Sequence, residues 1–122
     1  MKLLSILLLL LGPVTFVSAQ VQVDSNYTIL AQNVVGVGDV IPFLLPDFNR
    51  LVIQDNRSGK MCRPEHMDFT FVINSEALPA PTMDVANYLA ARVKPRDKIF
   101  IDKIIMPKDC FDPPKQIVLV IQ

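Results

Sequence analysis

The sequence predicts a mainly β protein, a small antiparallel β-sandwich with one short helix over residues 82–93. Three observations support this prediction. Short β-rich segments are separated by turns that contain proline or glycine. Residues 66–74 alternate apolar and polar side chains, as a strand with one buried face does. One segment has the spacing of an amphipathic helix. The alternative is a small α+β domain whose helix lies across an open sheet.

Size and charge limit the classes of function. The chain has 122 residues, which is room for one domain and one core. Its 12 basic and 12 acidic residues balance, and removal of Lys2 with an N-terminal signal would leave 11 against 12. A balanced domain has no electrostatic preference for nucleic acid or for an anionic membrane surface. The single histidine excludes mechanisms that need two imidazoles.

Residues 1–19 have the pattern of a secretory signal peptide. Lys2 provides the positive start, residues 3–11 form an apolar run, and small residues precede Ala19. We expect cleavage after Ala19, which leaves residues 20–122 as a single domain in the periplasm or outside the cell. The alternative is an uncleaved anchor, but the apolar run is too short to cross about 30 Å of hydrocarbon. No membrane span is therefore expected after signal cleavage.

The first half of the expected domain consists of short extended segments. They are a lead-in at 21–27 with a turn at 24–26, a β-rich stretch at 27–37, and a strand at 51–53 before a turn at 55–59. Between them, Pro42 and Pro46 bracket an apolar run. Because proline cannot donate to a sheet ladder, this run is expected to be an edge strand or a packed loop.

The clearest strand covers residues 66–74. The side chains expected on its buried face are Met67, Phe69, Phe71 and Ile73, and those expected on its outer face include His66, Asp68, Thr70 and Asn74. His66 is expected to be solvated at the entrance of the strand, with no partner implied.

The helix is predicted from Thr82, which can serve as its N-cap, with Asp84 in the first turn. One face collects apolar side chains, namely Val85, Ala86, Leu89, Ala90 and Val93. Pro95 is expected to end the helix, because the residue before a proline avoids the helical region. A helix of this length must pack on a sheet to be stable.

Two strands complete the domain. In residues 98–106, one face is expected to carry Ile99, Ile101, Lys103 and Ile105, and the other Phe100, Asp102, Ile104 and Met106. Residues 116–122 are apolar on both faces, so this last strand is expected at the centre of the sheet.

The two cysteines, Cys62 and Cys110, are expected to form a disulfide in an oxidising compartment. In the chain-entropy model such a bond contributes about 4 kcal/mol. The alternatives are two buried thiols, or a metal site that uses Cys62 and His66. A blue-copper centre needs two histidines and a structural zinc site usually needs four ligands, so no metal and no cofactor is expected.

The sequence contains no arrangement that specifies an enzyme. It lacks a Gly-Xaa-Ser-Xaa-Gly elbow and a phosphate-binding glycine loop. The loop at 110–115 is the candidate contact loop, with Phe111, Asp112, Pro113 and Pro114 as its candidate residues. A disulfide and two prolines would hold Phe111 rigid, which lowers the entropy cost of binding. The alternative is a spacer loop with Phe111 turned into the core.

The C-terminal half resembles a known family. The strand Met67-Asp68-Phe69-Thr70-Phe71-Val72-Ile73, a short helix, the phrase Val93-Lys94-Pro95-Arg96-Asp97-Lys98-Ile99-Phe100-Ile101-Asp102-Lys103-Ile104 and a terminal strand occur in that order. The segment from about Met67 to Gln122 is similar to the C-terminal domain of GldM, a component of gliding motility and type IX secretion in Bacteroidetes. The resemblance implies a β-sandwich. Arg96 stands where that family has glycine, and no functional residue is transferred.

These observations favour an exported, non-enzymatic β-sandwich that acts through protein–protein contacts. The expected partner is a protein, for example an envelope or secretion component, and not a nucleic acid. The alternative is a secreted inhibitor or adhesin-like binder that presents the loop at 110–115. Two sequons, at Asn26 and Asn56, become relevant only in a host that glycosylates its exported proteins.

Overall fold

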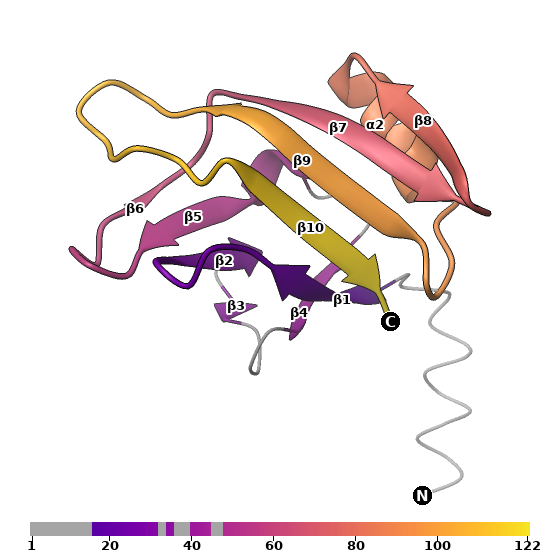
Figure 1. The fold of residues 1–122 in the computed structure, drawn as a ribbon, viewed down its shortest axis with the longest axis horizontal. Helices are drawn as coiled ribbons and strands as arrows, with labels where there is room; N and C mark the ends of the chain where they lie inside the picture. Colours follow the sequence, from indigo (N-terminus) through magenta and orange to yellow (C-terminus); the bar gives the residue numbers. More distant parts are fainter. Residues whose placement is uncertain (1–15, 32–33, 36–39, 45–47) are drawn as a thin grey trace, which may run out of the picture.

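The computed structural model describes residues 16–31, 34–35, 40–44 and 48–122. Within these residues the chain forms two antiparallel sheets and one α-helix, as predicted (Figure 1). The larger sheet has the order β4-β1-β10-β9-β7-β8, with bounds Val40–Leu44, Phe16–Gln22, Gln116–Ile121, Lys98–Ile105, His66–Ile73 and Glu76–Ala80. The smaller has the order β3-β2-β5-β6, with bounds Val34–Val35, Tyr27–Ala31, Val52–Asp55 and Met61–Cys62. Helix α2 covers Met83–Ala90, and a 3-10 turn, η1, covers Phe48–Arg50.

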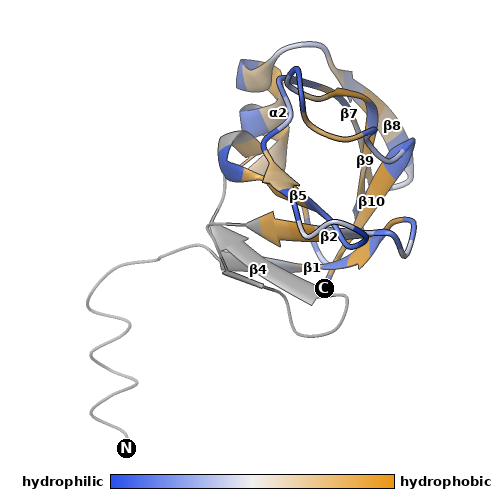
Figure 2. Ribbon diagram, turned by 90° about the vertical axis from the view of Figure 1, so that its left-hand side faces the viewer, coloured by the Kyte–Doolittle hydropathy of each residue, from blue (hydrophilic) through white to orange (hydrophobic). Residues whose placement is uncertain are grey.

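A single core fills the space between the two sheets. Strands β2 and β5 lie opposite β10 and β9, and α2 lies on the same side of the larger sheet as β5 (Figure 2). The largest side chains that are fully buried are Ile53, Phe71, Ile99, Ile101, Ile117 and Leu119. They come from both sheets, so the core depends on the two layers packing together.

Strand β7 has the predicted two faces. Phe69 and Phe71 are buried, whereas His66 at its start is exposed. The ring of Phe48 in η1 lies 4.8 Å from that of Phe69 and 6.0 Å from that of Phe71. The period-two alternation thus identifies which side of β7 faces the smaller sheet.

The outer half of β9 corrects the predicted faces. Asp68 pairs with Asp102, but His66 pairs with Ile105, so β9 has one more residue than β7 between these pairs. Lys103 lies in this bulge with a φ of 47°. The inserted residue reverses the alternation, so that Ile104 is buried and Ile105 is 54% exposed. The prediction that Ile105 shares a face with Ile99 and Ile101 was therefore wrong.

Helix α2 begins as predicted and ends earlier. The Thr82 side chain accepts a hydrogen bond from the backbone N–H of Val85, which confirms it as the N-cap. Ala86, Leu89 and Ala90 form the buried face. The helix ends at Ala90 and not at Val93, because the N–H of Arg92 bonds to the carbonyl of Leu89 and tightens the last turn. Pro95 lies in the following turn and does not end the helix.

Both edges of the larger sheet carry a proline. Pro42 in β4 pairs opposite Ser18, which confirms the predicted edge strand, and Pro79 in β8 pairs opposite Thr70. Strand β8 was not predicted, because a proline in a short segment argues against a strand unless it lies at an edge. A proline removes one backbone donor from each edge, which disfavours the addition of a further strand there.

Strand β10 lies between β1 and β9, as expected from its apolar composition. The predicted lead-in at 21–27 instead begins as the end of β1, and the predicted turn follows it, with the N–H of Tyr27 bonded to the carbonyl of Asp24. The expected cleavage point after Ala19 falls within β1. Cleavage there would leave Gln20–Gln22 paired with Val118–Val120 and would remove most of the β1–β4 pairing.

No helix in the part of the chain that the structure describes has the length and apolar character needed to cross a membrane.

Candidate functional site

The predicted Cys62–Cys110 disulfide is present and attaches the β9–β10 connection to strand β6. The two Cα atoms lie 6.6 Å apart, and the cysteines are separated by 48 positions in the sequence. The bond therefore joins the smaller sheet to a connection of the larger one. Because Cys110 is bonded to Cys62 in β6, the connection cannot move away from β6 at this point, and the disulfide thereby restricts the start of the loop that follows.

Two further contacts fix the candidate contact loop. The hydroxyl of Tyr27, in β2, donates a 2.7 Å hydrogen bond to the carbonyl oxygen of Asp112. The ammonium of Lys60 donates to the carbonyl oxygen of Asp109. The loop is thus held at three points, by β6, by β2 and by the turn that follows β5. This arrangement supports the expectation of a rigid loop.

Phe111 does not project from the loop. Its ring centroid lies 6.1 Å from that of Tyr27, and the side chain is half-buried against the core. Pro114 is buried, whereas Asp112 is exposed and Pro113 is intermediate. Of the four candidate contact residues, Asp112 is thus the most accessible. Phe111 and Pro114 help to hold the loop in place.

A concavity with a volume of about 390 Å³ lies beside this loop. The end of β9 and the connection line it, with Ile105, Met106 and Phe111 among the apolar residues. We call this surface the loop pocket. The bulge at Lys103 places Ile105 here with more than half of its surface exposed. An exposed isoleucine beside a fixed loop is the kind of apolar contact residue that a protein partner can cover.

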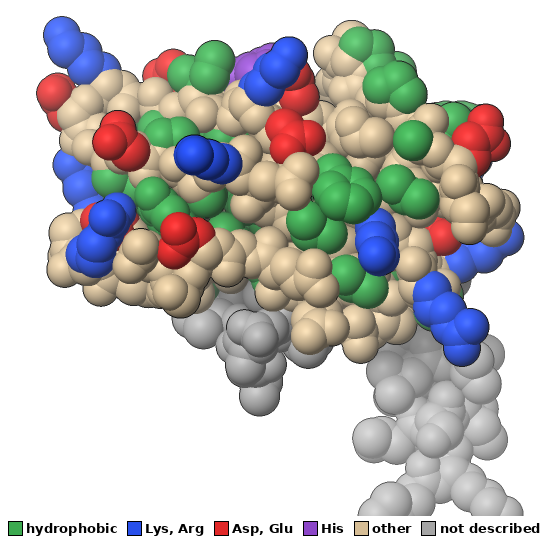
Figure 3. All heavy atoms as spheres, viewed as in Figure 1, with side chains coloured by type: hydrophobic (Ala, Val, Ile, Leu, Met, Phe, Trp, Pro, Cys, Tyr) green, Lys and Arg blue, Asp and Glu red, His purple; other side chains and the backbone are tan. Residues whose placement is uncertain are grey.

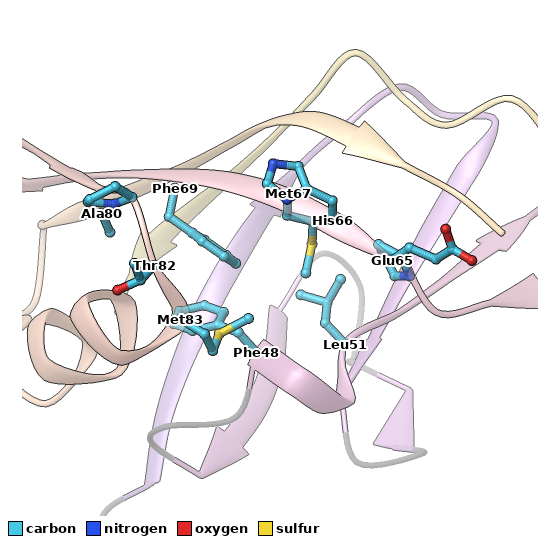
Figure 4. Close-up of a pocket in the computed structure, with 11 residues that line it drawn as sticks. Phe48, Leu51, Glu65, His66, Met67, Phe69, Ala80, Thr82 and Met83 are labelled. Atoms are coloured by element: carbon cyan, nitrogen blue, oxygen red, sulfur yellow. The ribbon is translucent and has the colours of Figure 1, made fainter.

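A second cavity, of about 300 Å³, lies between η1, β7 and the start of α2. Met67, Phe69 and Met83 extend toward its interior and Leu51 closes one side, while the Glu65 carboxylate points away (Figure 4). Eight of its eleven lining residues are apolar, and the other three are Glu65, His66 and Thr82.

His66 has a partner that the sequence did not imply. Its Nε2 lies 2.7 Å from Oδ1 of Asp68, two residues away on the outer face of β7. Oδ2 of Asp68 lies 3.8 Å from the ammonium of Lys103 in the bulge. All three side chains are between two-fifths and four-fifths exposed. Exposed ion pairs of this kind contribute little to stability.

Two buried carboxylates have structural roles that the sequence reasoning missed. Asp97 accepts hydrogen bonds from the backbone N–H groups of Lys94 and Asn74, at 2.8 and 3.3 Å. It thereby links the turn before β9 to the β7–β8 hairpin. The sequence did contain a signal for this role. Asp97 lies three residues after Lys94 in a turn that contains proline, and carboxylates at such positions often accept hydrogen bonds from the turn backbone.

Asp55 closes the predicted turn after β5. It accepts hydrogen bonds from Nε of Arg57 at 3.0 Å and from the hydroxyl of Ser58 at 2.9 Å. These bonds, first from Arg57 and then from Ser58, hold the pKa of the Asp55 carboxyl below its ordinary value. The guanidinium of Arg57 also lies 5.8 Å from the centroid of the Tyr27 ring. The β5 turn is thus connected through Tyr27 to the contact loop.

The two sequon asparagines meet at one end of the smaller sheet. The N–H of Asn56 bonds to the carbonyl of Asn26, and the side-chain amide of Asn56 donates to the carbonyl of Ser25. Both residues are exposed.

Among the described residues, no group of three or more His, Cys, Asp or Glu side chains is placed to hold a metal ion. In comparisons with known proteins, no family model, no curated protein and no solved structure matches the chain.

Proposed function

We propose that this chain is an exported, non-enzymatic module that binds another protein through the loop pocket and the contact loop beside it. The observation that supports the proposal is the three-point attachment of the loop, by the disulfide, by Tyr27 and by Lys60. A loop held in one conformation loses little entropy when it binds. The proposed partner class is a protein, for example a component of the envelope or of a secretion system.

The contact surface combines an apolar and a polar part. Ile105 is exposed at the loop pocket, and the acidic side chain of Asp112 is exposed beside it. An apolar centre with a polar rim is the usual arrangement in protein interfaces. A strand added to an edge of the larger sheet is a weaker alternative, because Pro42 and Pro79 interrupt both edges.

The inhibitor or adhesin hypothesis requires a side chain that projects from the loop into a partner. Phe111 was the candidate for this role, but its ring packs beside Tyr27. The half-buried position of Phe111 therefore favours binding by the surface of the pocket over insertion of a projecting residue.

Site-specific photo-crosslinking tests this proposal. A photoreactive residue at Asp112, introduced into the protein in its native host, should crosslink to one defined envelope protein. Tyr88 is 59% exposed on α2, away from the loop pocket, and provides the matched control position. The same product from both positions, or no product from position 112 while the host phenotype is normal, would contradict the proposal.

A further inference from the structure

The outer face of the larger sheet carries an apolar patch. The smaller sheet and α2 lie against the opposite face, and hydrophobic side chains are visible across the middle of the outer face (Figure 3). Phe100 pairs with Val118 on β10 and with Thr70 on β7, and the next row across the sheet is Val120, Lys98 and Val72. We call Val72, Phe100, Val118 and Val120 the outer patch. All four have intermediate exposure.

The charges around the outer patch are arranged with opposite signs at its two ends. Lys98 and Asp102 lie two residues on either side of Phe100 in β9, and all three point to the outer face. Residues two apart in a strand are separated by about 6.8 Å. Asp102 stands directly opposite Asp68, another acid. The acidic end is thus Asp102 with Asp68, and the basic end is Lys98.

Asp102 is in an unfavourable position in the single chain. Like charges directly opposite each other in a sheet are destabilising. Asp68 has His66 and Lys103 nearby. The carboxylate of Asp102 accepts a hydrogen bond from the side-chain amide of Gln116, and no cation among the described residues pairs with it. A cation brought to Asp102 from outside the chain would relieve this repulsion.

We infer that two copies of this chain associate face to face through the outer patch, about a two-fold axis. If β9 of one copy runs antiparallel to β9 of the other, Phe100 lies against Phe100 of the partner subunit. Lys98 then lies opposite Asp102 of the partner subunit, and the reverse pair forms at the same time. A two-fold interface must be self-complementary in this way. The basic–aromatic–acidic order along β9 meets that requirement, and aligned packing of two sheets is a common arrangement.

The size of the face determines the expected strength. The outer patch and its charged ends lie on three strands, and at about 4.8 Å per strand and about five residues of 3.4 Å each they cover about 250 Å² in projection. This is smaller than the roughly 800 Å² that each partner contributes to a stable interface. The dimer should therefore be weak and reversible, with a dissociation constant in the micromolar range, on the order of 10 to 100 μM.

Sedimentation equilibrium of the exported protein tests the inference. The exported protein should be monomeric at low concentration and dimeric at high concentration. Lys98→Asp, which places acid opposite acid, should weaken association at least about tenfold, and Asp102→Lys should do the same. The double variant Lys98→Asp/Asp102→Lys restores opposite charges across the two-fold axis, and its dissociation constant should return to within about threefold of the original.

Two further variants complete the test. Lys108→Asp reverses an exposed charge in the β9–β10 connection, outside the outer patch, and should leave association unchanged. Phe100→Ser should abolish dimerisation, with a thermal unfolding transition recorded to show that the variant folds. A protein that stays monomeric up to roughly several hundred micromolar, well above the expected dissociation constant, would overturn the inference. Failure of the double variant to recover association would also overturn it.

Discussion

Replacing Arg96 by glycine should stabilise the protein. Arg96 has a φ of 81°, in the left-handed region that favours glycine. It occupies the third position of the turn that starts at Lys94, where Pro95 is second and the N–H of Asp97 bonds to the Lys94 carbonyl at 3.0 Å. This is the position at which a type II turn requires a positive φ.

The magnitude follows from two opposing effects. A non-glycine residue at positive φ costs about 1–2 kcal/mol, whereas glycine loses about 0.5–1 kcal/mol more in conformational entropy on folding. The net gain should be about 0.5–1 kcal/mol. Little else changes, because the Arg96 side chain is exposed and its backbone N–H still donates to the Ile121 carbonyl in the variant.

Urea unfolding of matched variants measures this effect. Arg96→Ala removes the same side chain but keeps the Cβ, so its free energy of unfolding should stay within about 0.5 kcal/mol of the original protein. Arg96→Gly should then be more stable than Arg96→Ala. Equal stability of the two variants would refute the assignment of strain to the backbone at this position.

Three other effects on stability are expected. Phe71→Ala should lower the free energy of unfolding by about 3–5 kcal/mol because it leaves a cavity in the core. Asp68→Ala should change it by less than about 1 kcal/mol because the ion pairs of Asp68 are exposed. Equal losses of the two variants in chemical denaturation would contradict the two-faced strand. Replacing both Cys62 and Cys110 by serine should cost about 2–5 kcal/mol, and peptide mapping without reductant should recover the two linked peptides from the original protein. The folded pKa of Asp55 lies below its ordinary value of 3.8, so its stabilising effect is fully present above that value and is lost as the pH falls through the folded pKa. Asp55→Asn should therefore reduce the acid dependence of stability, and an unchanged pH profile would count against this role.

Local patterns predicted the parts of the fold in which local and tertiary preferences agree. The alternation in β7, the Thr82 cap of α2 and the central position of β10 each follow from short-range spacing, and the structure confirms them. The two cysteines allowed one pairing only, and that bond is present. Each of these features needs information from a few neighbouring residues.

The features that were missed depend on the partner strand or on a turn. The faces of β9 reverse because a bulge at Lys103 inserts one residue relative to β7, and a bulge has no reliable signature in one strand alone. Strand β8 follows a two-residue turn in which Asn74 and Ser75 both have positive φ. Asparagine tolerates this conformation, but serine is not a typical residue there, so the hairpin signal is weak.

The candidate site was predicted in part. The sequence identified the loop at 110–115 and the disulfide that holds it, but it could not identify Tyr27, which is 85 positions away from Asp112. The exposure of Ile105 depends on the bulge. The alternation of residues within one strand therefore could not predict the apolar part of the loop pocket.

The most direct test of the proposed function is complementation of a deletion strain by two single variants. Ile105→Asp places a charge in the loop pocket at an exposed position, and His66→Ala removes the chain's single imidazole. If the protein acts by binding through the loop pocket, Ile105→Asp should fail to restore the wild-type phenotype, whereas His66→Ala should restore it. Both variants should be exported and disulfide-bonded at normal levels. Loss of function with His66→Ala and full function with Ile105→Asp would contradict the proposal and would indicate that His66 takes part in chemistry.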